Sequence, residues 1–291
     1  MNTYRHDSES KQIVRGQWVQ YIKDIKEGDS SPLKLITLPS SEIQELFLYK
    51  EAGLIDAEYD ENSGQFDIKE GDIYCFEKKA SRYRELFEKL IGATTRQDDI
   101  GSYIRTHRPK ILNNKSNLGF PLDAVNLDFE GSLCKLKIPI EETVENIIAC
   151  QSASNKPFAF FLTFPNTEDT DTDEYKQSIR TELEKNLNDA YNIQFQDNFK
   201  HIHADIDSME YETLHTVAVF KSIIKQISQK NYTCDKSKII IYGDKERTPN
   251  FRKRMTSFLF KFVPDNSISH TEIYYRDILQ ALTSPDFLLD G

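Results

Sequence analysis

The chain has 291 residues, of which 38% are hydrophobic and 29% charged, with 18 phenylalanines and 14 tyrosines. These proportions exclude a disordered or low-complexity protein, because such chains lack the large apolar residues that a core requires. With 37 basic against 47 acidic residues, the formal net charge is −10. This balance excludes a uniformly basic coat for nucleic acid, although it is compatible with a local basic patch.

The cysteines and the apolar runs indicate the cellular setting. Cys75, Cys134, Cys150 and Cys234 are far apart and form no Cys-x-x-Cys motif, so neither a zinc ribbon nor a disulfide framework is predicted. Free thiols are typical of a reducing cytoplasm. The first thirty residues have no signal-peptide core, and apolar runs such as 158–164 are too short to span a bilayer. We therefore expect a cytoplasmic protein without membrane contact.

The first part of the chain predicts a helix and then three strand–helix units. Apolar residues recur at helical spacing after the cap residue Ser8, and Ser40 or Ser41 is a suitable N-cap for the second helix. The expected elements are a helix over 8–27, a strand over 33–38, a helix over 43–53, a strand over 72–76, a helix over 80–91, a weak strand over 93–96 and a short helix ending near Arg105. Residues 56–70 predict turns, and 105–115 predict a basic loop.

The remaining part predicts further alternation of strands and helices. The expected elements are strands over 123–127, 157–164, 238–242 and 272–275, and helices over 141–152, 174–191, 213–230 and 252–260. This alternation predicts an α/β fold with a mostly parallel sheet and helices on its faces. We expect an N-terminal helix over 1–32 and one α/β domain over 33–291, with strand 33–38 in the centre beside 72–76 and 123–127.

Polar residues follow four of the predicted strands. Ligands of such sheets bind at the carboxyl ends of the strands, near the point where the strand order reverses. A carboxylate after the second strand suits the two hydroxyls of a ribose, and one after the third suits the exocyclic amine of an adenine. The segments are Leu38-Pro39-Ser40-Ser41-Glu42, Glu77-Lys78, Asp98-Asp99 and Asp128-Phe129-Glu130-Gly131. The alternatives are a solvated Glu77 and a helix cap at Asp98 or Asp99.

In this order of strand ends, residues 33–164 resemble the class I S-adenosylmethionine-dependent methyltransferases. They are most similar to divergent bacterial or phage-type members with an Asp-Phe-x-Gly-like fourth motif, whose relatives modify nucleic acids. The resemblance implies a Rossmann-like sheet, S-adenosylmethionine as cofactor, and Asp128 and Phe129 as catalytic residues beside the reacting group. It implies that the cofactor is held by Leu38, Pro39, Ser40, Ser41, Glu42, Glu77, Lys78, Asp98 and Asp99.

The turn after the first strand departs from this family. Members normally have a glycine-rich turn there, because the backbone comes close to the methionine part of the cofactor. This chain has no glycine between Gly28 and Gly53, and its fourth motif lacks the prolines of the amino-methylating enzymes. Either Ser40 and Ser41 bind the cofactor in another way, or the chain is a non-catalytic subunit of a larger defence or nucleic-acid-processing assembly. Segment 132–242 would then offer a surface to a protein partner.

Three other patterns bear on the question of a partner or a metal. Two basic clusters predict contact with nucleic acid, with an ordinary mixed-charge surface as the alternative; their main residues are Arg105, Arg108, Lys110, Arg252, Lys253 and Arg254. His201, His203 and Asp205 resemble the ligand run of metal-dependent hydrolases, which would make the chain a hydrolase. The next residues are Ser208 and Met209 rather than a further histidine, so we predict no metal site.

Overall fold

The computed structural model describes residues 9–166, 171–188, 210–243, 254–265 and 286–289. Its elements are α1 (Glu9–Lys26), β1 (Lys34–Thr37), α2 (Gln44–Glu51), β2 (Asp56–Asp60), β3 (Gln65–Glu70), β4 (Asp72–Phe76), α3 (Ala80–Lys89), β5 (Leu90–Ile91), β6 (Thr94–Arg96), α4 (Ile100–Leu112), β7 (Ala124–Asp128), the 3₁₀ turn η1 (Leu133–Lys135), α5 (Ile140–Ser152), β8 (Phe158–Pro165), α6 (Asp173–Asn188), α8 (Tyr211–Ser228), β9 (Tyr232–Gly243), β10 (Arg254–Pro264) and β11 (Asp286–Leu289).

The main sheet is a doubly wound α/β sheet, which confirms the predicted fold class. Its strand order is β11-β9-β10-β8-β7-β1-β4-β6. Strand β1 pairs in parallel with β4 on one side and with β7 on the other, as the sequence predicts. Strands β6, β4, β1, β7 and β8 are all parallel, so the strand order reverses between β1 and β7. In such sheets this reversal is the point at which ligands bind.

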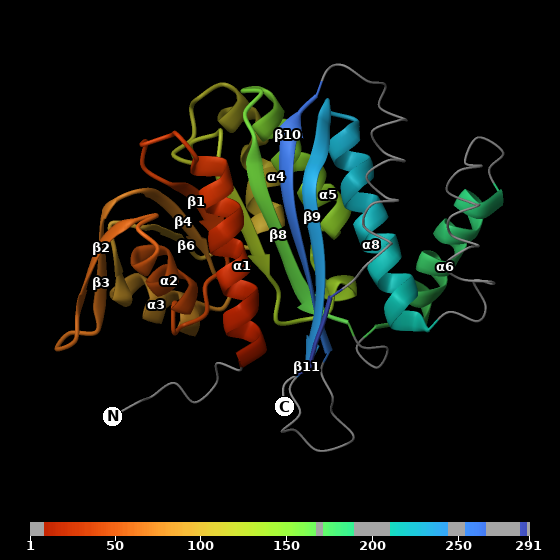
Figure 1. Ribbon diagram of the computed structural model, residues 1–291, viewed down its shortest axis with the longest axis horizontal. Helices are drawn as coiled ribbons and strands as arrows, with labels where there is room; N and C mark the ends of the chain where they lie inside the picture. Colours follow the sequence, from red (N-terminus) through yellow and green to blue (C-terminus); the bar gives the residue numbers. More distant parts are fainter. Residues whose placement is uncertain (1–8, 167–170, 189–209, 244–253, 266–285, 290–291) are drawn as a thin grey trace.

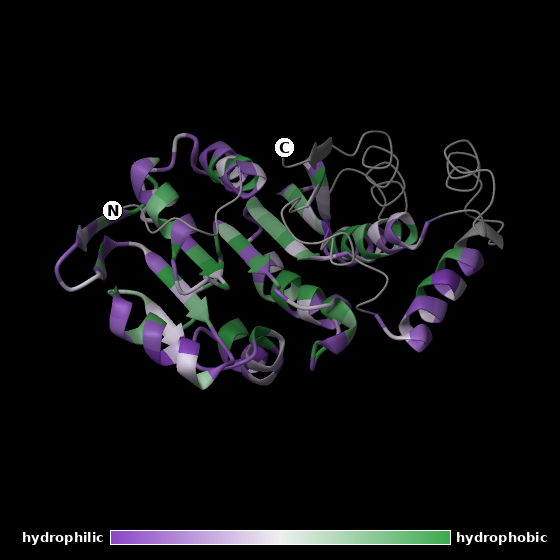
Figure 2. Ribbon diagram, turned by 90° about the horizontal axis from the view of Figure 1, so that it is seen from below, coloured by the Kyte–Doolittle hydropathy of each residue, from purple (hydrophilic) through white to green (hydrophobic). Residues whose placement is uncertain are grey.

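Helices cover both faces of the sheet (Figure 1). Helices α1, α2 and α3 share one buried cluster with residues such as Leu35 and Phe161, whereas α4, α5 and α8 share the opposite one with Ile36 and Phe160. Because neighbouring residues of a strand point to opposite faces, the apolar strand runs serve both clusters. Figure 2 shows these hydrophobic strands between helices whose outer surfaces are largely hydrophilic.

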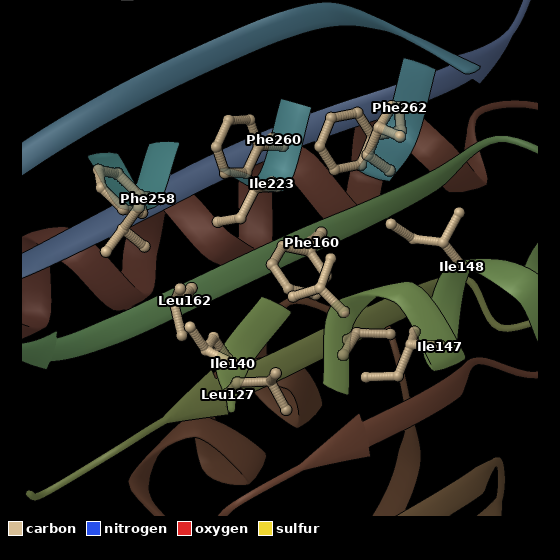
Figure 3. Close-up of a cluster of buried hydrophobic side chains, with 14 of the residues drawn as sticks. Leu127, Ile140, Ile147, Ile148, Phe160, Leu162, Ile223, Phe258, Phe260 and Phe262 are labelled. Atoms are coloured by element: carbon tan, nitrogen blue, oxygen red, sulfur yellow. The ribbon is translucent and has the colours of Figure 1, made fainter. Parts of the chain in front are cut away.

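The face toward α5 and α8 holds an aromatic core. Phe158, Phe160 and Leu162 of β8 and Phe258 and Phe260 of β10 are fully buried there, and Figure 3 shows Phe160, Leu162, Phe258 and Phe260 with isoleucines from the helices. Phe160 and Phe260 have ring centroids 6.4 Å apart. Each such side chain contributes about 1.5–3 kcal/mol of burial free energy, and this packing makes β7 and β8 a firm support for the loops that follow them.

The opposite face is closed by α1, which is amphipathic as the sequence predicts. Its Trp18 stacks on Phe161 of β8 with ring centroids 5.9 Å apart, and Tyr21 meets the same ring edge-on at 6.1 Å. Val14, Trp18 and Ile22 are buried, at the spacing that one helix face requires. The helix therefore packs directly on the sheet.

Three predictions about local structure are wrong. Residues 56–70 form the β2–β3 hairpin of a small second sheet rather than turns alone. Over residues 254–260 the predicted helix 252–260 is replaced by strand β10, which lies antiparallel between β8 and β9. The predicted loop over 105–115 belongs largely to helix α4. The predicted strand over 272–275 lies outside the described residues.

Candidate functional site

A cleft of about 310 Å³ opens at the carboxyl ends of β1, β4, β6 and β7. This volume lies at the lower end of the range for small-molecule sites. The lining residues come from all four strand ends that the sequence singled out, and they are Leu38, Pro39, Ser40, Phe76, Glu77, Lys78, Lys79, Arg82, Asp98, Asp99, Ile100, Asp128, Phe129, Glu130, Gly131, Ser132, Lys135 and Leu136. Parallel strands bring these distant segments together, because their carboxyl ends share one edge.

The turn after β1 forms one wall without any glycine. Leu38 continues the pairing with β7, since its N–H donates to the carbonyl of Asn126 at 3.2 Å. The hydroxyl of Ser40 is buried at the cleft and has no hydrogen-bond partner. Helix α2 does not begin at a serine cap as predicted, because its N-cap residue is Ile43 with φ 49°. A β-branched residue with positive φ is strained, and Ile43 is held there with a fully buried side chain.

Glu77 stands at the end of β4 and is half-buried. Its Oε1 accepts a hydrogen bond from the backbone N–H of Lys79 at 2.7 Å, just before α3 begins. Its own N–H donates to the carbonyl of Arg96 on β6 at 3.0 Å. The backbone position is therefore fixed from both sides. A carboxylate has about four acceptor positions, so this arrangement leaves Glu77 the capacity to accept from a ligand.

The two aspartates after β6 have different tasks. Asp99 is the N-cap of α4, and its Oδ1 accepts from the N–H of Ser102 at 3.0 Å. Asp98 Oδ1 accepts from the N–H of Asp99 at 2.8 Å. The cap that the sequence offered as an alternative is thus present at Asp99. Asp98, which also lines the cleft, caps no helix and has a second carboxylate oxygen to offer.

The end of β7 supplies the opposite wall. Asp128 is the last residue of the strand, and the N–H of Phe129 donates to the carbonyl of Thr163 on β8 at 2.8 Å. Two residues beyond Asp128, Glu130 Oε2 lies 2.5 Å from Arg82 Nη1 of α3. This ion pair connects the two walls of the cleft, 48 positions apart in the sequence.

Two predicted cofactor residues and the described residues of the basic clusters are not among the residues that line the cleft. Ser41 and Glu42 belong to the same turn but are not among the lining residues. On α4, Arg105 Nε lies 3.2 Å from Glu142, and Arg108 donates to Asn146 at 3.0 Å. Helix α4 begins at the cleft with Asp99 and Ile100, and Arg105, Arg108 and Lys110 are not among the lining residues. In the second cluster Arg254 pairs with Glu212 at 2.6 Å, whereas Arg252 and Lys253 lie outside the described residues.

A buried polar network lies behind the β7 wall, and the sequence gives no indication of it. The carboxylate of Asp171 accepts hydrogen bonds from the hydroxyls of Ser132, which lines the cleft, and Tyr211, the latter at 2.6 Å. His215 Nδ1 lies 3.1 Å from Asn166 Oδ1 and 3.6 Å from Asp171 Oδ2. These contacts fix the turn after β7 to the segment after β8 and to α8. Ser132 is thereby held in place by the protein itself.

His215 is neutral in this network. Burial lowers its pKa to about 4, although the nearby Asp171 carboxylate acts in the opposite direction. Tyr175 OH lies 3.2 Å from His215 Nε2. The neutral ring therefore donates from Nδ1 to the Asn166 oxygen and accepts from the tyrosine at Nε2. A histidine among apolar helix residues, as in Leu214-His215-Thr216-Val217, gives no sequence signal for this role.

A second buried group is equally hidden from sequence reasoning. Glu45 on α2 is only 4% exposed. Burial raises its pKa to about 7, Arg15 of α1 lowers it, and Asp128 raises it further. The sequence pattern gives no reason to single out Glu45, because a glutamate in a short helix is normally exposed.

No family model matches the chain, and no curated protein matches it. Among solved structures, the chain is similar to a presumptive RNA methyltransferase from Pyrococcus horikoshii, with 8% identity, 91% of each chain covered and a TM-score of 0.42. It is similar to an O-methyltransferase from a trans-AT PKS multienzyme of Brevibacillus brevis in complex with S-adenosyl-L-homocysteine, with 11% identity, 96% of this chain and 82% of that chain covered, and a TM-score of 0.40. The plantazolicin methyltransferase BpumL, in complex with SAH, has 11% identity, coverage of 88% and 86%, and a TM-score of 0.41.

The fold is a doubly wound α/β fold, and the strand order of the chain itself carries that assignment. The five parallel strands follow the doubly wound order. Toward one edge of the sheet, strand β10 lies between β8 and β9 and is antiparallel to both. Similarities at TM-scores near 0.4 add no argument about substrate or mechanism.

The predictions about a metal site and about a membrane-spanning helix can be compared with the structure only over the described residues. Within the described ranges, no group of three or more His, Cys, Asp or Glu side chains is placed to hold a metal ion. His201, His203 and Asp205 lie outside those ranges. None of the helices within those ranges combines the length and the apolar character needed to cross a membrane.

Proposed function

We propose that this chain is an S-adenosylmethionine-dependent methyltransferase-like protein that acts on, or binds, nucleic acid. The observation that carries the proposal is the convergence of four strand ends on one cleft at the point where the strand order reverses. Seven of the nine residues expected at the cofactor line that cleft, together with both expected catalytic residues. Doubly wound folds bind their ligands at this edge of the sheet, at the carboxyl ends of the strands.

The polar groups of the cleft suit an adenosine-containing cofactor. Glu77 offers a carboxylate to the ribose hydroxyls, and Asp98 offers one to the adenine amine. The buried Ser40 hydroxyl lacks a partner in the protein, and an unpaired buried hydroxyl costs about 1–3 kcal/mol. A ligand group that bonds to Ser40 would remove this cost. We therefore assign Ser40 to the methionine end of the cofactor, where the family has glycines.

The chemistry needs little more than orientation. S-adenosylmethionine supplies an electrophilic methyl group on a cationic sulfur. Asp128 would hold or accept the proton of the acceptor, and Phe129 would form the apolar surface beside it. The walls formed by the β1 turn and the β7 turn would exclude water and align the acceptor for in-line displacement.

The basic side chains of the cleft support an anionic acceptor, although they stand among five carboxylates and one of them, Arg82, is paired with Glu130. Lys78, Lys79, Arg82 and Lys135 all line the cleft, and none of these four belongs to the two basic clusters of the sequence. A phosphate backbone that crosses the opening would meet cations from both walls. Because such contacts release counterions, binding of a short RNA or DNA should weaken as salt rises.

Calorimetry of the full chain with S-adenosylmethionine and S-adenosylhomocysteine tests the cofactor. Incorporation of a labelled methyl group into DNA, RNA and protein fractions then tests the activity, with Asp128→Asn as the comparison. We expect binding of both ligands, and incorporation that falls in the variant. Failure of both ligands to bind at millimolar concentration would refute the proposed cofactor.

A non-catalytic subunit is the second candidate. The side chains of the β1 turn favour it, because Pro39 and Ser40 occupy space that glycines leave open. The Arg82–Glu130 ion pair across the cleft also favours it, since a ligand would have to fit beneath it or part it. Ligand binding without methyl incorporation into any fraction would support this candidate over the enzyme.

A further inference from the structure

A polar row interrupts the apolar face of the sheet beneath the cleft, on the side covered by α1 and α2. Thr37 of β1 is in register with Cys75 of β4 and with Asn126 of β7, so the three side chains point to the same face. Asp128 is two residues beyond Asn126 and shares that face. The row therefore leads from the buried middle of the sheet to the cleft.

Helix α2 places Glu45 and Tyr49 over this row. The two are four residues apart and lie on one side of the helix. Glu45 approaches Thr37, and Tyr49 approaches Asn126. Even so, Thr37 Oγ1, Tyr49 OH and Asn126 Oδ1 make no hydrogen bond. All four residues are at most 4% exposed.

Such a cluster is costly for stability alone. Each unpaired buried polar group costs about 1–3 kcal/mol, and a buried carboxyl requires either a partner or a proton. Groups that are close without reaching bonding geometry commonly hold a water between them. Because folding does not favour this arrangement, a role in the cleft above it accounts for it better.

Glu45 is close enough to Asp128, which lines the cleft, for the charges of the two carboxylates to interact. The two carboxyl groups repel each other. A cation bound beside Asp128 would be attracted by both. A neutral ligand of the same shape would gain nothing from Glu45, because Coulomb attraction needs charge on both partners.

We propose that Glu45 is a specificity-determining residue that favours a cationic sulfonium ligand over the neutral thioether left after methyl transfer. This inference rests on the proposed function. In that reaction the bond from sulfur to methyl breaks, the bond from acceptor to methyl forms, and sulfur keeps the electron pair and loses its charge. The acceptor proton goes to Asp128 or to water. Attraction from Glu45 therefore ends with the transfer, which assists release of the product.

The ionisation of Glu45 gives the effect a pH dependence. The groups that face it are Arg15 of α1, Asp128 of β7, Tyr49 of its own helix and the buried thiol of Cys75. Burial raises the pKa of both Tyr49 and Cys75 far above neutral, so these two stay uncharged. Preference for the cation should rise as the pH passes upward through about 7, where Glu45 loses its proton.

Calorimetry on the full chain with S-adenosylmethionine and S-adenosylhomocysteine measures this preference as a ratio of dissociation constants. For Glu45→Gln we expect the preference for the cation to fall roughly three- to tenfold, with affinity for the neutral ligand within about twofold of wild type. Glu51→Gln is the matched control, because Glu51 lies on the same helix and is exposed. It should leave the ratio unchanged.

Proton release on ligand binding is a second readout. It is measured on the unmodified protein and therefore tests the inference even if Glu45→Gln does not fold. Slightly below the pKa of Glu45, titrations in buffers of different ionisation enthalpy should show more proton release with the cation than with the neutral ligand. Equal release by both ligands, or an unchanged ratio in Glu45→Gln, would overturn the inference alone. If neither ligand binds the wild type, the proposed function fails, and the inference fails with it.

Discussion

Replacement of Glu77 by glutamine separates a ligand-binding role from a structural one. The amide oxygen can still accept from the N–H of Lys79, which lies 2.7 Å from the Glu77 carboxylate, so the start of α3 is kept. What is lost is the charge and one acceptor for the ribose hydroxyls. A hydrogen bond to a charged group contributes about 1.5–3 kcal/mol. Glu77 is half-buried, which places the effect toward the lower end.

We therefore expect affinity for S-adenosylhomocysteine to fall roughly 10- to 30-fold in Glu77→Gln, at about 1.4 kcal/mol per tenfold change. Calorimetry measures the affinity, and thermal denaturation should show an unchanged midpoint. Glu88→Gln, an exposed position on α3, serves as the control. Equal affinity in Glu77→Gln and wild type would remove Glu77 from the site and, with it, the main residue assignment behind the cofactor.

Four further outcomes are expected. Asp128→Asn should keep S-adenosylhomocysteine binding but lower methyl incorporation roughly 10²–10⁴-fold in a labelled-donor assay; equal incorporation would contradict its role as a base. For His215, whose folded pKa of about 4 is below the ordinary value of 6.5, the unfolded chain binds the extra proton between these two pH values. The free energy of unfolding should therefore decrease by up to about 3 kcal/mol as the pH is lowered from about 6.5 to about 4. Urea titration should show a smaller decrease in His215→Gln. For Glu45, with a folded pKa of about 7 against an ordinary 4.5, stability is lost as pH rises between these values, so Glu45→Gln should gain about 2–3 kcal/mol relative to wild type above that window and little below it; a pH-independent difference would exclude ionisation as the cause. Gly101→Ala should lower the free energy of unfolding by about 1–2 kcal/mol because its Cβ would lie 2.5 Å from Thr143 Oγ1, whereas Gly16→Ala, with open space around it, should raise it by up to about 1 kcal/mol.

The central strands could be predicted because most of their side chains are apolar and buried, whichever face of the sheet they point to. Strands β1, β7 and β8 are buried on both faces and form apolar runs. Once parallel order is inferred, the carboxyl ends of these strands must share an edge. This is why residues as distant as Ser40 and Asp128 can be expected in one cleft from the order of the predicted strands.

The wrong elements have weak or ambiguous patterns. In β2 only Ala57 is buried, so the strand has almost no apolar alternation, although Asn62-Ser63-Gly64 is a suitable turn for a hairpin. In β10 the aromatic residues Phe258, Phe260 and Phe262 recur at every second position, which is the period of a strand. The helical interpretation of 252–260 is wrong because this period does not fit one face of a helix.

The buried polar groups could not be predicted because their partners come from distant segments. Asp171 binds hydroxyls from Ser132 and Tyr211, which are 39 and 40 positions away. Glu45 lies under Asp128 only because α2 packs on the face where β1 and β7 adjoin. Such contacts depend on the tertiary arrangement, whereas sequence patterns report mainly the local period of burial.

The missing glycines are a weaker argument against a cofactor than the sequence suggests. Ile43 adopts the left-handed conformation with φ 49°, one that glycine adopts without strain. For a residue with a side chain, this conformation costs about 1–2 kcal/mol. The complete burial of Ile43 contributes about 1.5–3 kcal/mol, which is enough to hold the turn. One left-handed position at the end of this turn is therefore kept without glycine, and the side chains of Pro39 and Ser40 still occupy volume at the cleft. In the proposed function the Ser40 hydroxyl, which is buried without a partner at the cleft, would bind the cofactor, so that its side chain would contribute to the site as well as occupy volume in it.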